Sequence, residues 1–349
     1  MAANGFCNVR ARAPLRLGLA GGGTDLSPYC DLYGGAALNV TIDRFAFASL
    51  RGGENGRVAF RADDVSMEES FEAAPDLPLD GGLILHRAVY NRMVRQFLGG
   101  NAPSLILSTT VDAPPGSGLG SSSALVVAMV EAFRGSFNLP LGPYDVAHLA
   151  FEIERIDLAL AGGKQDQYAA AFGGLNFIEF LADDRVIVNP LRVSNAFLNE
   201  FESSIVVCFT GQSRNSDEII ARQISGIKSL SEETIKNLDQ LKNDAVEMKQ
   251  ALLGGRLSEM RPLFDRSWNA KKRTASGITT AGIESIMVLA KSHGATTGKV
   301  SGAGGGGFVM LLTDPENRYR LVSALNAGGG QASPVYFTQN GAEMWITGN

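Results

Sequence analysis

The chain has 349 residues, of which 45% are hydrophobic and 19% are charged. This composition supplies a large core and excludes wholesale disorder, and the length predicts about two domains. The formal net charge of −5, from 31 basic and 36 acidic residues, disfavours a general nucleic-acid binder. The three cysteines are far apart, the arginine-containing start lacks the apolar run of a signal peptide, and no stretch approaches the roughly 18 apolar residues of a membrane helix. We therefore expect a cytoplasmic protein with no membrane or nucleic-acid partner.

The first half of the chain mixes strand and helix patterns. Strict alternation predicts a strand over 9–19, with Arg10, Arg12 and Arg16 on one face. Further strands are predicted over 40–50 and 104–111, and helices over 85–97, over 124–137 and from Pro143 with an apolar face reaching Leu160.

The composition changes near 189–199, which we take as a domain boundary. A strand over 204–209 and several polar helices between 217 and 292 follow, then two strands around a glycine loop, a helix over 315–327 and two more strands. Because strands and helices do not alternate regularly, we predict an α+β protein with domains at 1–190 and 191–349.

The strongest chemical signal is the segment from Pro114 to Ala124, which lies between a strand and a buried helix. It contains Gly116, Gly118 and Gly120, followed by the serines 121–123. Glycines let a backbone approach a ligand, and the amides at the following helix start attract anions. The alternative is an ordinary serine-capped turn, but three glycines with three serines favour phosphate binding. No lysine follows the glycines, so this is not a Walker A loop.

Three other segments are candidates for a site. Arg16 precedes the loop 21–25, which ends in a carboxylate suited to sugar hydroxyls, although a salt-bridged or solvated arginine face is the alternative. Segment 162–167 reads Gly-Gly-Lys-Gln-Asp-Gln and fits either a catalytic Lys–Asp pair or a capped helix start. Segment 300–308 has five glycines in six positions, which indicates packing against another loop or a ligand.

Together these segments resemble the motifs of the GHMP kinases, the small-molecule kinase superfamily that includes galactokinase and mevalonate kinase. The match rests on Pro-Pro-Gly-Ser-Gly-Leu-Gly-Ser-Ser-Ser-Ala from Pro114, on Ser-Gly-Ala-Gly-Gly-Gly-Gly-Phe from Ser301, and on the segment from Arg12 to Asp25. The resemblance implies a two-domain fold, with a ribosomal protein S5 domain 2-like first half and a ferredoxin-like second half. It also implies ATP and Mg²⁺.

The resemblance assigns roles to five positions. Ser122 and Glu154 match the magnesium-binding serine and glutamate of the family. Asp166 matches its base or electrostatic anchor, and Arg16 matches the basic residue that bridges acceptor and γ-phosphate. Asp25 matches the galactokinase aspartate that holds sugar hydroxyls.

The predicted sets around these positions are larger. The nucleotide-binding set is Pro115, Gly116, Ser117, Gly118, Leu119, Gly120, Ser121, Ser122 and Ser123. The acceptor-binding set is Gly22, Gly23, Thr24, Asp25, Lys164, Gln165, Arg214, Gly304 and Gly305, with Arg214 as a clamp for a sugar phosphate.

One departure from galactokinases narrows the substrate. Galactokinases have Gly-Glu-His-Thr-Asp where this chain has Gly-Gly-Gly-Thr-Asp at 21–25, and Lys164 adds a cation. The pattern is most similar to the kinases of D-glycero-D-manno-heptose 7-phosphate, which implies phosphorylation of the anomeric hydroxyl to the 1,7-bisphosphate for nucleotide-activated heptose and surface polysaccharide. The expected partner is a small sugar phosphate, and homo-oligomer formation stays open.

Three alternatives stand beside this interpretation. A fucokinase-like or other sugar 1-kinase is the nearest. From other classes come a nicotinamide-dependent oxidoreductase, argued from the glycine loops, and a non-catalytic sugar sensor. The basic run Lys271 to Arg273 is interpreted as a solvated helix face that could lie at a cleft mouth.

Overall fold

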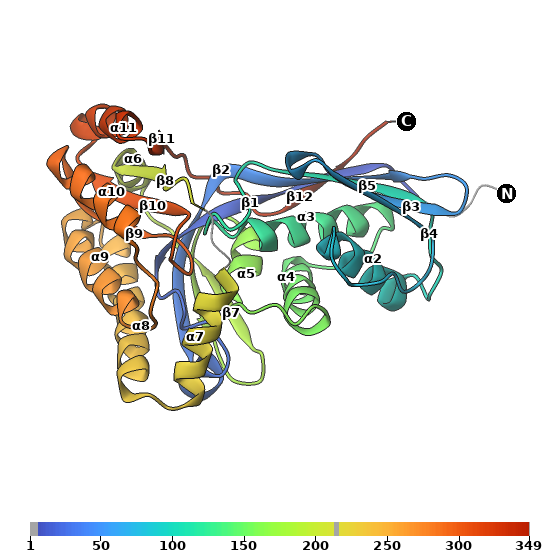
Figure 1. Ribbon diagram of the computed structural model, residues 1–349, viewed down its shortest axis with the longest axis horizontal. Coiled ribbons are helices and arrows are strands. Elements are labelled where there is room, and N and C mark those ends of the chain that lie inside the picture. Colours follow the sequence, from blue (N-terminus) through green and yellow to red (C-terminus); the bar gives the residue numbers. More distant parts are fainter. Residues whose placement is uncertain (1–5, 213–215, 349) are drawn as a thin grey trace.

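The computed structural model describes residues 6–212 and 216–348, and these form two sheets with helices packed on them (Figure 1). The larger sheet has the order β12-β1-β2-β5-β3-β4, and β6 and β7 continue from β2. Its strands are β1 (Val9–Ala20), β2 (Gly35–Gly52), β3 (Arg57–Ala62), β4 (Met67–Glu72), β5 (Leu105–Val111), β6 (Leu175–Phe180), β7 (Val186–Pro190) and β12 (Glu343–Ile346).

The smaller sheet is antiparallel and has the order β11-β8-β10-β9. Its strands are β8 (Ile205–Phe209), β9 (Ala295–Val300), β10 (Phe308–Thr313) and β11 (Gln331–Pro334). Counted along the chain, this order is fourth, first, third, second, which is the ferredoxin-like arrangement expected for the second half.

The helices follow the predicted order. They are α1 (Tyr29–Tyr33), α2 (Ile84–Phe97), α3 (Ser121–Ser136), α4 (Pro143–Glu152), α5 (Gln165–Phe172), α6 (Asn195–Ser203), α7 (Ser216–Lys228), α8 (Glu232–Leu253), α9 (Leu257–Lys272), α10 (Ala281–Ser292) and α11 (Arg318–Ala327). Helix α8 contacts α9, β1 and β2, and α9 contacts β9, so these two helices connect the sheets. The α+β prediction is confirmed. No helix in the described ranges combines the length and apolarity needed to cross a membrane.

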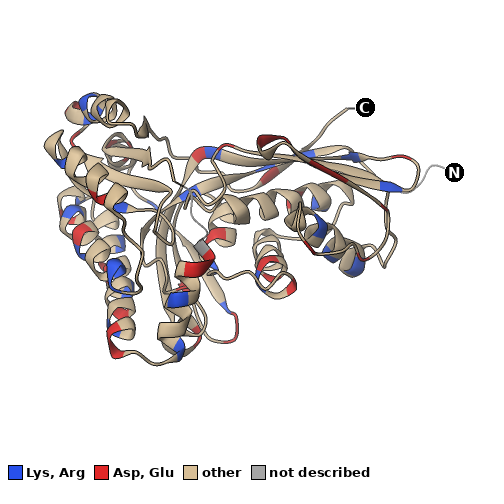
Figure 2. Ribbon diagram, in the orientation of Figure 1, with Lys and Arg blue, Asp and Glu red and all other residues tan. Residues whose placement is uncertain are grey.

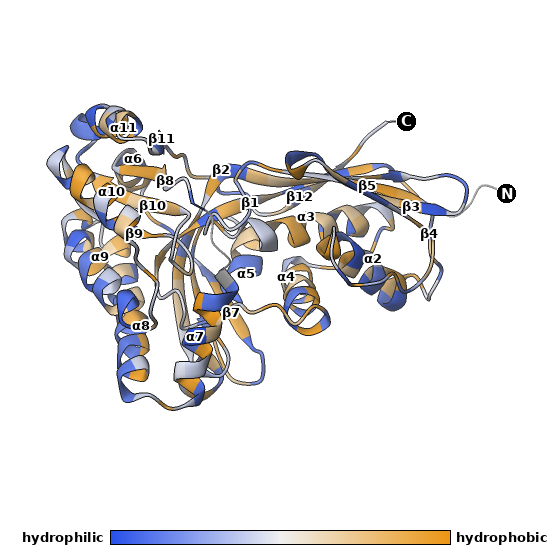
Figure 3. Ribbon diagram, in the orientation of Figure 1, coloured by the Kyte–Doolittle hydropathy of each residue, from blue (hydrophilic) through white to orange (hydrophobic). Residues whose placement is uncertain are grey.

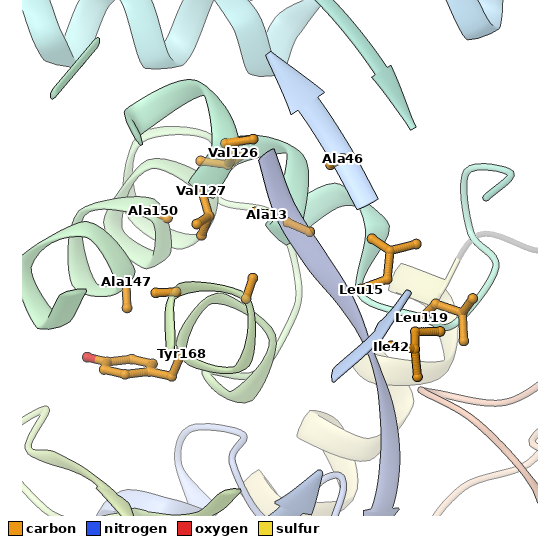
Figure 4. Packing of buried hydrophobic residues seen from close by; sticks show 14 of the residues in the cluster. Ala13, Leu15, Ile42, Ala46, Leu119, Val126, Val127, Ala147, Ala150 and Tyr168 are labelled. Carbon is orange, nitrogen blue, oxygen red and sulfur yellow. The ribbon is translucent and has the colours of Figure 1, made fainter. Parts of the chain in front are cut away.

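Helix α3 lies at the centre of the packing on the larger sheet, because most of its side chains are buried. It contacts β1, β2 and α5, and Figure 4 shows Val127 of this helix pointing toward the side on which Ala150 of α4 lies. Strands β8 and β10 are hydrophobic in Figure 3, whereas α8 and α9 carry hydrophilic faces. Acidic and basic residues alternate along those two helices in Figure 2, as expected of solvated faces.

Strand β1 departs from strict alternation. Its pairing with β2 shifts register between Pro14 and Arg16, so Leu15, Arg16 and Leu17 are all buried. A bulge of this kind re-aims a side chain. It turns Arg16 inward, while Arg12 stays half-exposed and pairs with Glu343.

The helix predicted to continue from Pro143 to Leu160 is too long. Helix α4 ends at Glu152 and is followed by a π-helical turn at Ile153–Asp157. The wider turn rotates the following side chains, so Ile156 is 61% exposed, whereas Glu154 is 1% exposed. The change of period places a carboxylate in the interior.

The end of the chain returns to the larger sheet. Strand β12 pairs with β1 along 9–12, and Ile42 forms a bridge with Phe337. Strand pairing therefore attaches 343–346, near the end of the predicted second domain (191–349), to the sheet of the first half. The boundary near residue 190 stays a prediction.

Candidate active site

The phosphate turn, residues 113–120, joins β5 to α3. Gly116, Gly118 and Gly120 have φ values of +69°, +78° and +75°, a region that glycine adopts without strain. Gly120 precedes α3 and supplies no side-chain cap. The first amides of α3 therefore keep their hydrogen-bonding capacity for a ligand, at the positive end of the helix dipole.

The glycine-rich loop 301–307, between β9 and β10, packs directly on this turn. The Phe308 amide donates to the Ser117 carbonyl at 2.9 Å, and a methyl group added at Gly118 would stand 2.3 Å from the Ser301 carbonyl oxygen. The expectation that this loop packs against another loop is confirmed. The backbone of the loop between β9 and β10 of the smaller sheet thus supports the phosphate turn.

Gly118→Ala should therefore cost more than strain of the backbone alone. Gly100 has the same kind of φ, +80°, and nothing within 4 Å of an added Cβ, so Gly100→Ala serves as the matched control. We expect the control to lose about 1 kcal/mol of unfolding free energy. Gly118→Ala should lose about 2 kcal/mol more, because the two loops must separate. Urea unfolding of the two variants measures the difference, and equal losses would refute the close packing.

A cavity of about 390 Å³ lies in front of the phosphate turn. From the predicted nucleotide-binding set it is lined by Pro115, Gly116, Gly118, Gly120, Ser121, Ser122 and Ser123. Ser117 and Leu119 do not line it. Ser117 is fully buried behind the turn. Leu119 packs beside Leu15 and Ile42 (Figure 4), and its carbonyl accepts from the Arg16 amide at 3.0 Å. These two residues anchor the turn to the core.

A second, mostly apolar cavity of about 320 Å³ shares four residues with the first: Pro115, Gly116, Ser121 and Ser122. Its other walls come from β3 to β4, from the start of α2 and from the end of β5. They include Val65, Met67, Leu83 and Leu85, and Leu125 of α3 completes the apolar lining. An apolar slot that adjoins a phosphate site suits a flat nucleobase. The sequence did not reveal it, because its walls come from segments that no motif marks.

Ser122 and Glu154 meet at the floor of the 390 Å³ cavity. The Ser122 hydroxyl donates to Oε1 of Glu154 at 3.0 Å, and Gln167 Nε2 donates to Oε2 at 2.6 Å. Both Ser122 and Glu154 line the cavity. A hydroxyl and a carboxylate form an oxygen donor set suited to Mg²⁺, which keeps its remaining positions for water and substrate phosphates. The residues present therefore fit the expected ion.

Buried Arg16 and partly exposed Asp166 form an ion pair at the cavity wall. The Arg16 guanidinium donates through Nε to Asp166 Oδ1 at 2.8 Å and through Nη1 to the Gly118 carbonyl at 2.7 Å. The Asp166 carboxylate is 24% exposed and lies in the first turn of α5, so the helix dipole favours its charge. A methyl group at Gly120 would stand 3.3 Å from Asp166 Oδ2. The carboxylate thus faces the start of α3.

A third cavity, of about 80 Å³, opens on the other side of this pair; we call it the acceptor cavity after the residue set predicted to line it. Arg16, Gly163, Asp166, Ile220, Gly302 and Ala303 line both this cavity and the 390 Å³ cavity. The two spaces therefore meet at Arg16 and Asp166. From the predicted acceptor-binding set, Gly22, Gly23, Asp25 and Gln165 line it.

The Asp25 carboxylate accepts three hydrogen bonds that hold it in place. Its Oδ1 accepts from the Gly23 amide at 3.0 Å and from Gln165 Nε2 at 3.2 Å, and its Oδ2 accepts from the Gln165 amide at 3.1 Å. Oε1 of Gln165 is buried and has no partner among the described groups. This orphaned acceptor and the Asp25 carboxylate suit hydroxyl donors of a ligand.

Other members of the predicted acceptor set lie elsewhere. Thr24 is fully buried, and its hydroxyl bonds the Gly21 and Ala36 carbonyls, so it closes the loop rather than facing the cavity. Lys164 pairs with Asp184 at 2.6 Å and Asp31 at 3.6 Å, away from the cavity.

The remaining members of the predicted acceptor-binding set are Gly304, Gly305 and Arg214. Gly304 and Gly305 contact Ile278, with the Gly305 amide donating to its carbonyl at 2.7 Å, so Gly302 and Ala303 are the loop residues at the cavities. Arg214 lies outside the described residues.

Two cations at the acceptor cavity were missed. Lys271 and Lys299 line it, and both are 7% exposed. The expectation that Lys271 belongs to a solvated face is wrong. Helix α9 packs against β9, and this contact turns Lys271 inward, whereas Lys272 lies over the Trp268 ring. A third cation, Arg155, lines the 390 Å³ cavity beside Glu154.

Comparisons with known proteins agree with this geometry. The model of the GHMP kinases N terminal domain matches residues 84–174, and the model of the GHMP kinases C terminal region matches 248–331. D-glycero-alpha-D-manno-heptose 7-phosphate kinase of Campylobacter jejuni is 41% identical over 97% of this chain and 98% of its own length. The chain belongs to the GHMP kinases.

Membership in the GHMP kinases makes this protein a phosphotransferase, so the oxidoreductase alternative is wrong. A crystal structure of a D-glycero-D-manno-heptose 1-phosphate kinase from Bacteroides thetaiotaomicron superposes with a TM-score of 0.83 at 40% identity, over 98% of this chain and 100% of that one. Lactococcus lactis galactokinase with galactose gives 0.76 at 19% identity, over 97% and 95%, which shows the shared fold alone.

Proposed function

We propose that the chain transfers the γ-phosphoryl group of ATP to the anomeric hydroxyl of D-glycero-D-manno-heptose 7-phosphate. The product is the 1,7-bisphosphate, a precursor of nucleotide-activated heptose for surface polysaccharide, made in the cytoplasm. The observation that carries the proposal is the meeting of a phosphate-binding cavity and a hydroxyl-binding cavity at one Arg–Asp pair. The heptose names of the two relatives near 40% identity supply the substrate class.

In this proposal the nucleotide occupies the two cavities along the phosphate turn. The amides at the start of α3 hold its phosphates, and the apolar slot beside Pro115 holds the base. Ser122 and Glu154 would hold Mg²⁺, which neutralises charge on the β- and γ-phosphates when bound.

Asp166 then acts on the acceptor. Its carboxylate takes the proton as the hydroxyl oxygen bonds to the γ-phosphorus, and the bond from that phosphorus to the bridging oxygen breaks to release ADP. An anomeric hydroxyl is more acidic than an ordinary alcohol, so a carboxylate is a sufficient base. Arg16 orients Asp166 and offsets the charge of the transferred group from the same position.

Asp25 and Gln165 position the sugar by accepting hydrogen bonds from its hydroxyl groups. Because Asp166, Arg16 and Glu154 are all present with their contacts formed, the arrangement favours a working enzyme over a sugar sensor. A fucokinase-like or other sugar 1-kinase would use the same groups, so the acceptor has to be identified by experiment.

A coupled ADP-release assay over free and phosphorylated sugars tests the proposal. The panel contains heptose, heptose 1-phosphate, heptose 7-phosphate, fucose and galactose. We expect kcat/KM to be highest for heptose 7-phosphate by at least about 10-fold, as one fixed contact to a charged group provides. A highest value for fucose or heptose 1-phosphate would replace the proposed acceptor.

A further inference from the structure

The acceptor cavity contains two buried ammonium groups that the proposed chemistry does not use. Lys271 at the end of α9 donates to the Gly22 carbonyl at 2.9 Å, and Lys299 at the end of β9 donates to the Leu19 carbonyl at 2.9 Å. Among the described residues, neither forms an ion pair. An ammonium has three donors, so each lysine keeps donors that no group of the described chain receives.

A structural buried lysine in the same chain looks different. Lys164 is 3% exposed; burial acts to lower its pKa, but the carboxylates of Asp184 and Asp31, which its ammonium contacts, help to raise the pKa above the ordinary value. A buried charge of this kind is compensated by opposite charges. Lys271 and Lys299 each donate to one carbonyl, and among the described residues neither has a carboxylate at ion-pair distance.

The other charged groups at the cavity do not neutralise the two lysines. Arg16 is paired with Asp166, and Asp25 is occupied by two backbone amides and a side-chain amide. Three cations therefore line the cavity against two carboxylates that already have partners.

The pKa values of the two lysines are lowered, as expected for ammonium groups that lack a paired carboxylate. Burial lowers the pKa of Lys271 to about 8, with a raising contribution from Asp25 and a lowering one from Arg16. Burial lowers the pKa of Lys299 to about 7, helped by repulsion from Lys271 and Arg16 and opposed by Asp244 of α8. A dianion placed between the two groups would favour their charged forms and raise both values, so its binding would take up protons near pH 8.

We propose that Lys271 and Lys299 bind the phosphate group that the acceptor already carries, and that this pair selects a phosphorylated sugar over the free one. The inference rests on the proposed function, because it concerns the acceptor of that same reaction. The sugar lies between Asp166, where its hydroxyl reacts, and the two lysines, where its phosphate binds. A phosphate accepts several hydrogen bonds from converging cations, which gives strong and specific contacts.

Lys271→Met and Lys299→Met test the inference, with Lys272→Met as the control on the same helix. Each cavity variant should lower kcat/KM for heptose 7-phosphate by about 10- to 100-fold, mainly through KM. The value for unphosphorylated heptose should stay within about threefold of the parent. Equal losses for both sugars, or no loss for either, would overturn the proposal.

A binding measurement separates this inference from the proposed reaction. Calorimetric titration of heptose 7-phosphate without nucleotide, at pH 8 in buffers of different ionisation enthalpy, should show proton uptake that the Lys271→Met/Lys299→Met double variant loses. Uptake without any ADP release in the assay would support the phosphate site and refute the reaction. Normal ADP release with no uptake, and with an unchanged preference in the variants, would refute the phosphate site and support the reaction.

Discussion

Asp166→Asn is expected to lower kcat by about 10²- to 10⁴-fold, the range that a positioned general base contributes. The amide oxygen can still accept from Arg16, so the pair should keep its shape, but the side chain no longer takes the proton of the attacking hydroxyl. Because the nucleotide is proposed to bind along the phosphate turn, which this substitution leaves intact, the increase in melting temperature caused by ATP should be retained. Steady-state ADP release and thermal denaturation with and without ATP measure the two effects.

Asp112→Asn is the control for this variant. Asp112 follows β5 close to the phosphate turn, but it accepts from the Phe45 amide and lines none of the three cavities. Its replacement should leave kcat within about threefold of the parent. An Asp166→Asn enzyme with a kcat as high as that of the control would remove Asp166 from the reaction.

Glu154→Gln is expected to raise the Mg²⁺ concentration for half-maximal activity by about 10-fold or more, and to lower kcat at any fixed Mg²⁺ concentration. The substitution keeps the size of the side chain but removes its negative charge. It also places an amide where Gln167 Nε2 now donates at 2.6 Å. A Mg²⁺ titration at constant ATP measures the shift.

Glu152→Gln provides the matched comparison, since Glu152 lies two residues earlier and pairs with Arg92 at 2.8 Å outside the cavities. This variant should keep the Mg²⁺ dependence of the parent. If Glu154→Gln and Glu152→Gln respond to Mg²⁺ alike, Glu154 does not hold the ion.

The sequence could predict those parts of the site that lie in continuous segments. The phosphate turn combines its glycines, its serines and the start of α3 within twelve residues, and short-range chemistry is enough to recognise it. The approximate positions of the strands and helices also follow from local periodicity. The pairing of Arg16 with Asp166 joins positions 150 apart, so the chemistry alone left it open, and only the resemblance to the family suggested both roles.

The rest of the site depends on tertiary packing. Lys271 and Lys164 illustrate this, because each sits in a polar segment whose pattern does not say which way the side chain points. The packing of α9 against β9 turns Lys271 into the cavity, while the start of α5 directs Lys164 toward Asp184. The structure therefore places Lys271 at the acceptor cavity and Lys164 outside its lining. The π-helical turn that buries Glu154 is a similar case, since the helical period beyond Glu152 predicted otherwise.

A crystal structure with a non-hydrolysable ATP analogue, Mg²⁺ and heptose 7-phosphate tests the central claim most directly, because the claim concerns which groups meet at Arg16 and Asp166. We expect the terminal phosphate at the start of α3, the anomeric hydroxyl within hydrogen-bonding distance of Asp166, and the sugar phosphate at Lys271 and Lys299. A nucleotide bound away from residues 113–120, or a sugar whose anomeric hydroxyl points away from Asp166, would contradict the account.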